Sequence, residues 1–189
     1  MWRNLMFLNT PYYIKEEAFS KSFCEGVITQ GDNQEKTEAV IADGDNNNRK
    51  SNITWLQNDN LTEQLTLIVN EVNTNTDWNF LLKEFEPLQY SVYNIDDHYD
   101  WHIDSHSRTY DNGLIRKLSF TLFLNEDYEG GDFRICEPHP NPLKHSEQLF
   151  KPKTGSMVIF PSHKWHKVDK VTSGIRKTLV GWIVGTPFV

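Results

Sequence analysis

The chain has 189 residues, of which 38% are hydrophobic and 13% aromatic, which suits one globular domain with a substantial core and excludes an intrinsically disordered protein. Its formal net charge is −7, and its Lys and Arg residues form no basic run. We therefore expect no nucleic-acid partner, because binding to a phosphate backbone depends on clustered cations.

The two cysteines, Cys24 and Cys136, lie far apart in the sequence. They form neither a disulfide framework nor the spacing of a thiolate metal site, so we expect reduced, partly buried thiols. The N-terminal residues lack the pattern of a signal peptide, and no stretch approaches the ~20 apolar residues of a membrane helix. We expect a soluble, cytoplasmic protein with no membrane partner.

The first part of the chain is predicted to be helical. Apolar residues recur at helical spacing from Ile14 to Ile28, and Gly31 is placed to end that helix. Ala39–Ala42 predicts a brief strand, and the Asp- and Asn-rich segment Asp43–Asn48 predicts a flexible loop.

A second helix is predicted to begin at a cap residue, Asp59 or Asn60. Apolar residues at helical spacing line one of its faces: Leu61, Leu65, Ile68 and Val72.

From about Glu84 the pattern changes to short runs that are rich in β-branched and aromatic residues, which predict strands. These runs are Leu88–Tyr93, Leu118–Leu124, Phe133–Cys136, Met157–Phe160, Trp165–Val168 and Ile175–Val184. Turn signals separate them: Gly130-Gly131, Pro138 to Pro142, Lys153 to Gly155 and Thr172 to Gly174.

Helices followed by many short strands predict a mainly β fold with flanking helices (α+β). We expect an antiparallel barrel or jelly roll with the N-terminal helices packed on one of its sheets. The chain is expected to form a single domain over 1–189, with a helical support region at 1–84 and the barrel core at 85–189.

A His-x-Asp motif, His102 and Asp104, follows an apolar strand. Side chains two apart on a strand point to the same face, so both can reach one ion. His166, at the start of a late strand, is the best third ligand. Two imidazoles and one carboxylate leave the other positions of a metal open, which is the ligand set of non-haem Fe(II) oxygenases.

Arg176 lies ten residues after His166, beyond the turn Thr172 to Gly174. We expect the two strands to form a hairpin, with Arg176, Thr178 and Trp182 on one face of the second strand. A guanidinium inside the barrel would bind the distal carboxylate of a dicarboxylate through two hydrogen bonds, and the Thr178 hydroxyl would add a donor.

Other histidines offer weaker alternatives. His98 and His102 have the i, i+4 spacing of a zinc-protease helix, but the segment lacks the required Glu. His106 could replace a ligand, but His166 and its following Arg would then have no role. The remaining histidines are expected in exposed loops: His139, His145 and His163.

Three motifs lie in the second half of the chain, besides a looser one at Arg49-x-Ser51-x3-Trp55. They are Tyr93-x5-Tyr99-x2-His102-x-Asp104; Tyr128-x-Gly130-Gly131-Asp132-Phe133 after the strand Leu118–Asn125; and Lys153-x-Gly155 through Phe160-Pro161-x4-His166 to Gly174-x-Arg176. Together they resemble the prolyl 4-hydroxylase-like branch of the 2-oxoglutarate oxygenases, which includes the bacterial PKHD-type hydroxylases.

This resemblance implies a double-stranded β-helix (jelly-roll) fold. It also implies that iron is held by His102, Asp104 and His166, and that the C5 carboxylate of 2-oxoglutarate is held by Arg176. Tyr93 matches a position beside the cosubstrate, Trp182 matches an aromatic residue of the pocket, and Tyr99 faces either the pocket or the core. For Tyr93 and Trp182, ordinary core packing is the alternative.

The function implied is an Fe(II)- and 2-oxoglutarate-dependent dioxygenase that uses O2 to hydroxylate an unactivated C–H bond, with succinate and CO2 as co-products and ascorbate as an optional reductant. A peptidyl prolyl residue is the first expectation for the substrate, and a free amino acid or other small molecule is the alternative. Asp43–Asn48 and Ser105–Gly113 are the loops expected near a bound chain. A non-catalytic jelly-roll binding module and a zinc or manganese cupin are the readings from other classes.

Overall fold

The structure is a computed structural model that describes residues 10–39, 48–105, 109–137 and 146–187. Its helices are α1 (Lys21–Asp32) and α2 (Asp59–Asn75). Its strands are β1 (Tyr13–Lys15), β2 (Thr37–Glu38), β3 (Arg49–Lys50), β4 (Asn52–Leu56), β5 (Leu82–Phe85), β6 (Leu88–Tyr93), β7 (His98–His102), β8 (Ile115–Phe123), β9 (Tyr128–Gly130), β10 (Phe133–Glu137), β11 (Ser146–Phe150), β12 (Met157–Pro161), β13 (Trp165–Val168), β14 (Val171–Gly174) and β15 (Arg176–Gly185).

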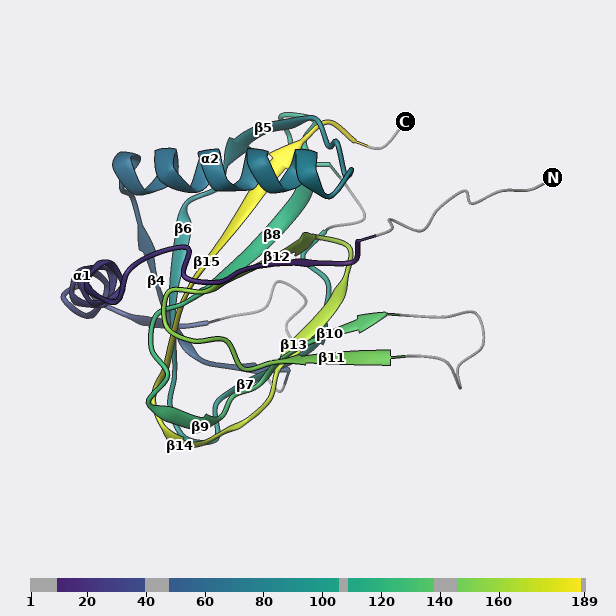
Figure 1. The fold of residues 1–189 in the computed structure, drawn as a ribbon. Helices are drawn as coiled ribbons and strands as arrows, with labels where there is room; N and C mark the ends of the chain where they lie inside the picture. Colours follow the sequence, from purple (N-terminus) through teal and green to yellow (C-terminus); the bar gives the residue numbers. More distant parts are fainter. Residues whose placement is uncertain (1–9, 40–47, 106–108, 138–145, 188–189) are drawn as a thin grey trace.

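The strands form two main antiparallel sheets (Figure 1). The larger sheet has the order β1-β12-β8-β15-β6-β4-β2, with β5 also paired to β15, and the smaller has the order β11-β10-β13-β7-β3. A short pair, β14-β9, lies at one end of the molecule. The expected antiparallel, mainly β fold is confirmed.

Alternation along β12 shows how the layers are packed. Met157 and Ile159 point toward the helices, in a core that also contains Val27 of α1 and Leu65 of α2. The side chain of Phe160 points the other way, into a second core between the two sheets. Both faces of the larger sheet are therefore buried, and the helices cover its outer face as predicted.

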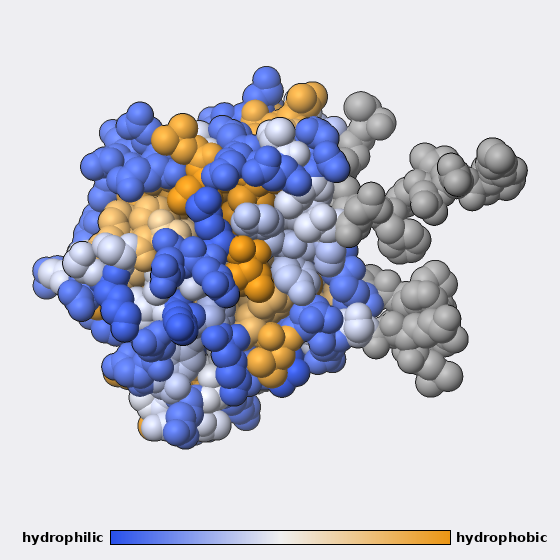
Figure 2. Space-filling view, in the orientation of Figure 1, coloured by the Kyte–Doolittle hydropathy of each residue, from blue (hydrophilic) through white to orange (hydrophobic). Residues whose placement is uncertain are grey.

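The second core is mainly aromatic and lies between the sheets. It contains Tyr93, Phe123, Phe133, Ile135, Phe150, Val158, Phe160, Val168 and Val171. On the face of the molecule in Figure 2, hydrophilic residues cover most of the described surface, with hydrophobic patches between them. Within the described ranges, no helix is long and apolar enough to cross a membrane.

The first helix is shorter than predicted at one end and longer at the other. Ile14 lies in β1, and α1 begins after Ser20, whose hydroxyl accepts a hydrogen bond from the Phe23 N–H. Gly31 lies inside the helix, so the prediction that it ends the helix was wrong. A Cβ at this position would overlap the Tyr90 ring, so Gly31 allows the helix to approach β6 closely.

The second helix agrees with the prediction apart from its cap. Asn58, one residue earlier than expected, accepts a hydrogen bond from the Leu61 N–H. The predicted strand at Ala39–Ala42 is not seen at Ala39, and residues 40–42 lie outside the described ranges, as do residues 43–47 of the predicted loop.

All six predicted strands of the second half are present, and β6 and β13 agree residue for residue. The predicted hairpin between β13 and β15 is wrong. The predicted turn Thr172–Gly174 lies in the strand β14, which pairs with β9. It carries the chain from the smaller sheet, where β13 pairs with β10 and β7, to the centre of the larger one.

Candidate metal centre

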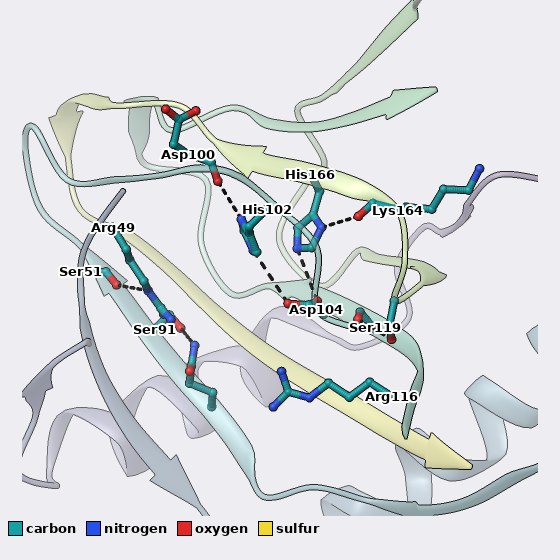
Figure 3. A network of polar contacts seen from close by, with 12 residues as sticks. Arg49, Ser51, Ser91, Asp100, His102, Asp104, Arg116, Ser119, Lys164 and His166 are labelled. Atoms are coloured by element: carbon teal, nitrogen blue, oxygen red, sulfur yellow. Dashed lines mark hydrogen bonds and ion pairs between the residues drawn. The ribbon is translucent and has the colours of Figure 1, made fainter. Parts of the chain in front are cut away.

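His102 and His166 lie opposite each other on neighbouring strands of the smaller sheet, and Asp104 follows the end of β7. Nε2 of His166 is 3.4 Å from one carboxylate oxygen of Asp104, and Nε2 of His102 is 3.8 Å from the other. The candidate ligand atoms of the three residues all lie within 4.8 Å of one another. Figure 3 shows the three side chains converging.

A bulge in β7 aims His102 into this centre. Two residues of β7, Asp100 and Trp101, lie opposite the single residue Lys167 of β13. Tyr99 and His102 are three residues apart, yet the extra residue places both on the inner face, where their rings stack.

Asp104 is positioned beyond the strand, so the predicted period-two pairing with His102 is not what places it. Its backbone N–H donates to the carbonyl oxygen of Ser162 at 2.9 Å, and Ser162 immediately follows β12. The hydroxyl of Ser119 on β8 donates to the hydroxyl of Ser162 at 2.9 Å. The backbone of Asp104 is thus held by Ser162, which Ser119 of β8 holds in turn.

Hydrogen bonds define the protonation of both imidazoles. Nδ1 of His102 lies 2.7 Å from the carbonyl oxygen of Asp100, and Nδ1 of His166 lies 2.9 Å from that of Lys164. A carbonyl can only accept, so each Nδ1 donates its proton, and in the neutral tautomer Nε2 is the nitrogen that presents a lone pair to the centre. Burial, with the neighbouring His166, lowers the pKa of His102 to about 3, so this ring is neutral at physiological pH.

The carboxyl group of Asp104 is ionised. Burial alone would raise its pKa, but the nearby His166, the Arg116 guanidinium and the Ser119 hydroxyl lower it below the usual range. Two imidazole nitrogens and one carboxylate are a donor set suited to Fe(II).

Arg176 is one of the largest fully buried side chains of the protein, with 1% of its surface exposed. Its guanidinium carbon lies 5.2 Å from the centre of the Tyr93 ring and 5.3 Å from that of Phe123. Nη1 donates a long hydrogen bond of 3.5 Å to the Thr178 hydroxyl. Nε and Nη2 have no hydrogen-bond partner among the described residues.

A buried guanidinium with two unused donors is costly unless an anion binds it. Gly131 keeps space for this side chain, because a Cβ there would lie 2.9 Å from Cδ of Arg176. Phe133 connects the two parts of the site: its ring centre is 6.3 Å from that of Phe123 and 5.8 Å from that of His166. The Arg176 guanidinium and the His166 imidazole therefore pack against one aromatic core.

The structure adds a charged cluster that the sequence did not reveal. Arg116 donates from Nε and Nη2 to the two carboxylate oxygens of Glu86, at 2.7 and 2.6 Å. The Tyr110 hydroxyl donates to Glu86 at 3.0 Å. Trp182 joins this cluster, because the Arg116 guanidinium carbon lies 4.0 Å from its ring centre. The ring centre of the half-exposed Trp55 is 6.2 Å from that of Trp182.

The predicted residues thus fall into three groups. His102, Asp104 and His166 converge, Arg176 meets Thr178 and Tyr93, and Trp182 lies beside Arg116. Of the alternative ligands, Nδ1 of His98 faces the carbonyl of Asp96, and His106 lies outside the described residues. Of the histidines expected in exposed loops, His163 is exposed in the turn before β13, and His139 and His145 lie outside the described residues.

Comparison with known proteins identifies the type of site. A family model described as the 2OG-Fe(II) oxygenase superfamily matches residues 88–184. A PKHD-type hydroxylase of Rippkaea orientalis is 34% identical over 122 residues, which cover 60% of this chain and 52% of the relative. One of Shewanella oneidensis is 36% identical over 103 residues, covering 53% of this chain and 43% of the relative. The chain thus spans about half the length, or less, of the curated relatives it matches.

Solved structures show the same fold. A prolyl-4-hydroxylase of Pseudomonas putida superposes with a TM-score of 0.72 and 19% identity, over 95% of both chains. A viral collagen prolyl hydroxylase of Paramecium Bursaria Chlorella virus-1, determined as a 2OG complex, gives 0.69 and 20%, over 94% of this chain and 98% of that one. The predicted double-stranded β-helix fold is confirmed.

Proposed function

Because the chain belongs to the 2OG-Fe(II) oxygenase superfamily, we propose that it is a 2-oxoglutarate-dependent dioxygenase that hydroxylates an unactivated C–H bond and releases succinate and CO2. The observation that carries this proposal is the pairing of two features in one core. A His, Asp, His donor set lies on one side, and a buried arginine with unused donors lies on the other.

His102, Asp104 and His166 would hold Fe(II) on one side of the ion. When bound, iron supplies the open coordination positions at which the cosubstrate and O2 can react. The carbonyls of Asp100 and Lys164 keep both imidazoles in the tautomer that presents Nε2.

Arg176 would bind the distal carboxylate of 2-oxoglutarate with Nε and Nη2, and Thr178 would orient the guanidinium through Nη1. Tyr93 packs beneath this position. The surrounding aromatic side chains exclude water, which strengthens the ion pair. Residues 1–189 would act as one unit, because β3 and β4 of the first part pair with β7 and β6 of the second.

A peptidyl prolyl residue is the substrate that we propose first, ahead of a free amino acid or other small molecule. The similar proteins named PKHD-type hydroxylases and prolyl hydroxylases support this choice, and a prolyl hydroxylase of Trichoplax adhaerens with the same fold was solved with a peptide fragment. The half-exposed Trp55 offers a flat apolar surface of the kind on which a pyrrolidine ring packs, and the buried Trp182 lies beside it.

The test is incubation of the purified chain with Fe(II), 2-oxoglutarate, a proline-containing peptide library and isotope-labelled O2, with and without ascorbate. Mass spectrometry should find one labelled oxygen in succinate and one in a peptide. Labelled succinate together with an unchanged library would support the enzyme class and reject the peptide substrate. No labelled succinate under any condition, although the chain binds iron and 2-oxoglutarate, would reject the enzyme class.

A further inference from the structure

A stack of three side chains lies beside the candidate metal centre. The rings of Tyr99 and His102 are nearly parallel, with centres 3.4 Å apart and an angle of 11° between their planes. The guanidinium carbon of Arg49 lies 4.6 Å from the centre of the same Tyr99 ring. Arg49 and His102 therefore both pack on Tyr99.

The backbone holds Arg49 in this place. Arg49 and Tyr99 are direct partners in the pairing of β3 with β7, so their side chains are cross-strand neighbours. Nε of Arg49 donates to the hydroxyl of Ser51 at 3.0 Å, as Figure 3 shows. Arg49 lies outside residues 88–184, the part that the family model matches.

The two histidines of the centre differ in what fixes their rings. His166 packs against Phe160 and Phe133, which are core residues, and its side chain is 7% exposed. His102 is 16% exposed, and apart from His166 its ring contact among the described residues is Tyr99. The hydrogen bond to Asp100 holds the imidazole at Nδ1, and the Tyr99 ring packs along its face.

We infer that Arg49 is a positioning residue for His102 and acts through Tyr99. This inference rests on the proposed function, because it assigns His102 to the metal. Without Arg49, the Tyr99 ring loses one of its contacts, and the ring against which His102 packs is then less firmly held. Residues that orient metal ligands are typically worth about 10- to 100-fold in metal affinity.

The experiment measures Mn(II) affinity by anaerobic titration of the full chain, with Mn(II) as a redox-stable probe of the iron site. Arg49→Ala should weaken binding about tenfold, within the range expected for a cation over an aromatic ring next to a ligand. Arg49→Lys, which keeps a cation over the ring, should recover most of this loss. Tyr99→Phe, which keeps the stack, should bind like the wild type.

The control is Arg134→Ala. Arg134 is a partly buried arginine of the same sheet, on β10, and donates to Asp169 and not to a residue of the centre. Arg134→Ala should leave the Mn(II) affinity unchanged while lowering the free energy of unfolding about as much as Arg49→Ala does. A second readout is the visible spectrum of bound Co(II), which reports ligand geometry and should change in Arg49→Ala but not in Arg134→Ala.

Mn(II) binding by Arg49→Ala that equals the wild type, or an equal loss in Arg134→Ala, would overturn the inference. If Arg49→Ala does not fold, Arg49→Gln replaces it, because Gln keeps a planar polar group without the cation. A wild-type chain that binds no Mn(II) or Co(II) would instead overturn the proposed metal site, so the two failures are distinguishable.

Discussion

Nδ1 of His102 donates to the carbonyl oxygen of Asp100, two residues earlier in the chain. His166 makes the same bond to Lys164, also two residues earlier. Both acceptors are backbone groups of the strand that carries the histidine or of the turn just before it. The tautomer of each imidazole is therefore set by local strand geometry, with no dependence on a second side chain.

The neutral state of His102 predicts how stability depends on pH in the metal-free protein. The pKa of His102 is lowered to about 3 by burial and by His166, whereas an unfolded chain protonates near pH 6.5. The unfolded state thus binds more protons between these values, and the free energy of unfolding rises with pH, by at most about 1.4 kcal/mol per unit. Urea unfolding in chelator should give a lower midpoint at pH 5 than at pH 7.

His102→Gln removes this titration and should reduce the difference between the two pH values. His98→Gln, on the same strand, is the control and should keep it. A wild-type midpoint that is the same at pH 5 and pH 7 would contradict the assignment of a neutral, buried imidazole.

Arg176 should control affinity for 2-oxoglutarate. Loss of one partner of a buried charged pair costs several kcal/mol, so Arg176→Ala should raise the KM for 2-oxoglutarate roughly 100-fold. Arg176→Lys should raise it about tenfold, because an ammonium keeps the charge but not the two parallel donors. Succinate release at a series of 2-oxoglutarate concentrations gives these values.

A 2-oxo acid without the distal carboxylate provides the control substrate. It should be used poorly by the wild type and no worse by Arg176→Ala, because the lost contact is absent from both reactions. A normal KM for 2-oxoglutarate in Arg176→Ala would show that the carboxylate binds elsewhere.

The sequence predicted the residues of the centre better than their surroundings. The structure brings the predicted residues His102, Asp104 and His166 together and buries Arg176; their residue types and motif spacing are visible in the sequence. The Arg116–Glu86 pair joins residues 30 positions apart, and no periodicity links an Arg on β8 to a Glu that lies between two strands. Such a pair becomes visible only when the sheet brings the two elements together.

The error at Thr172–Gly174 has a related cause. Ser, Thr and Gly favour turns, and Gly174 does have a positive φ of 73°. The segment is nevertheless a strand, because β9 offers its backbone partners. Partners that are distant in sequence decide strand pairing, so a segment rich in turn-forming residues can still form a strand.

The Arg116–Glu86 pair should stabilise the fold. Its side chains are 15% and 19% exposed and share two short hydrogen bonds, so breaking it should cost about 1–3 kcal/mol, between the values for surface and buried pairs. Glu86→Gln should lower the free energy of urea unfolding by this amount.

Glu71→Gln is the matched control. Glu71 pairs with Lys15 at the surface, with 54% and 30% of the side chains exposed, and its loss should cost less than about 0.5 kcal/mol. Equal effects of the two substitutions would show that the Glu86 pair is no more than a surface contact.

Gly155 should be essential to the packing of the N-terminal segment on the barrel. It has a φ of +86°, and a Cβ there would collide with the carbonyl oxygen of Phe19. Gly113 has a similar φ of +76° with no atom within 4 Å of a Cβ. Gly113→Ala should cost about 1–2 kcal/mol for the left-handed backbone alone, and Gly155→Ala should cost roughly 3 kcal/mol or more because the clash adds to this.

Both values come from urea unfolding of the single variants, and their difference isolates the contribution of the clash. Equal losses in the two alanine variants would show that the segment around Phe19 moves away without cost.

The most direct test of the central claim is O2-dependent conversion of 2-oxoglutarate to succinate in the presence of Fe(II), measured for the wild type, His166→Ala and His163→Ala. His163 lies three residues before His166 and takes no part in the centre, so His163→Ala controls for loss of a nearby imidazole. The account predicts succinate from the wild type and from His163→Ala, and a loss of at least about 100-fold in His166→Ala. Unchanged conversion in His166→Ala would contradict the assignment of His102, Asp104 and His166 as the iron ligands.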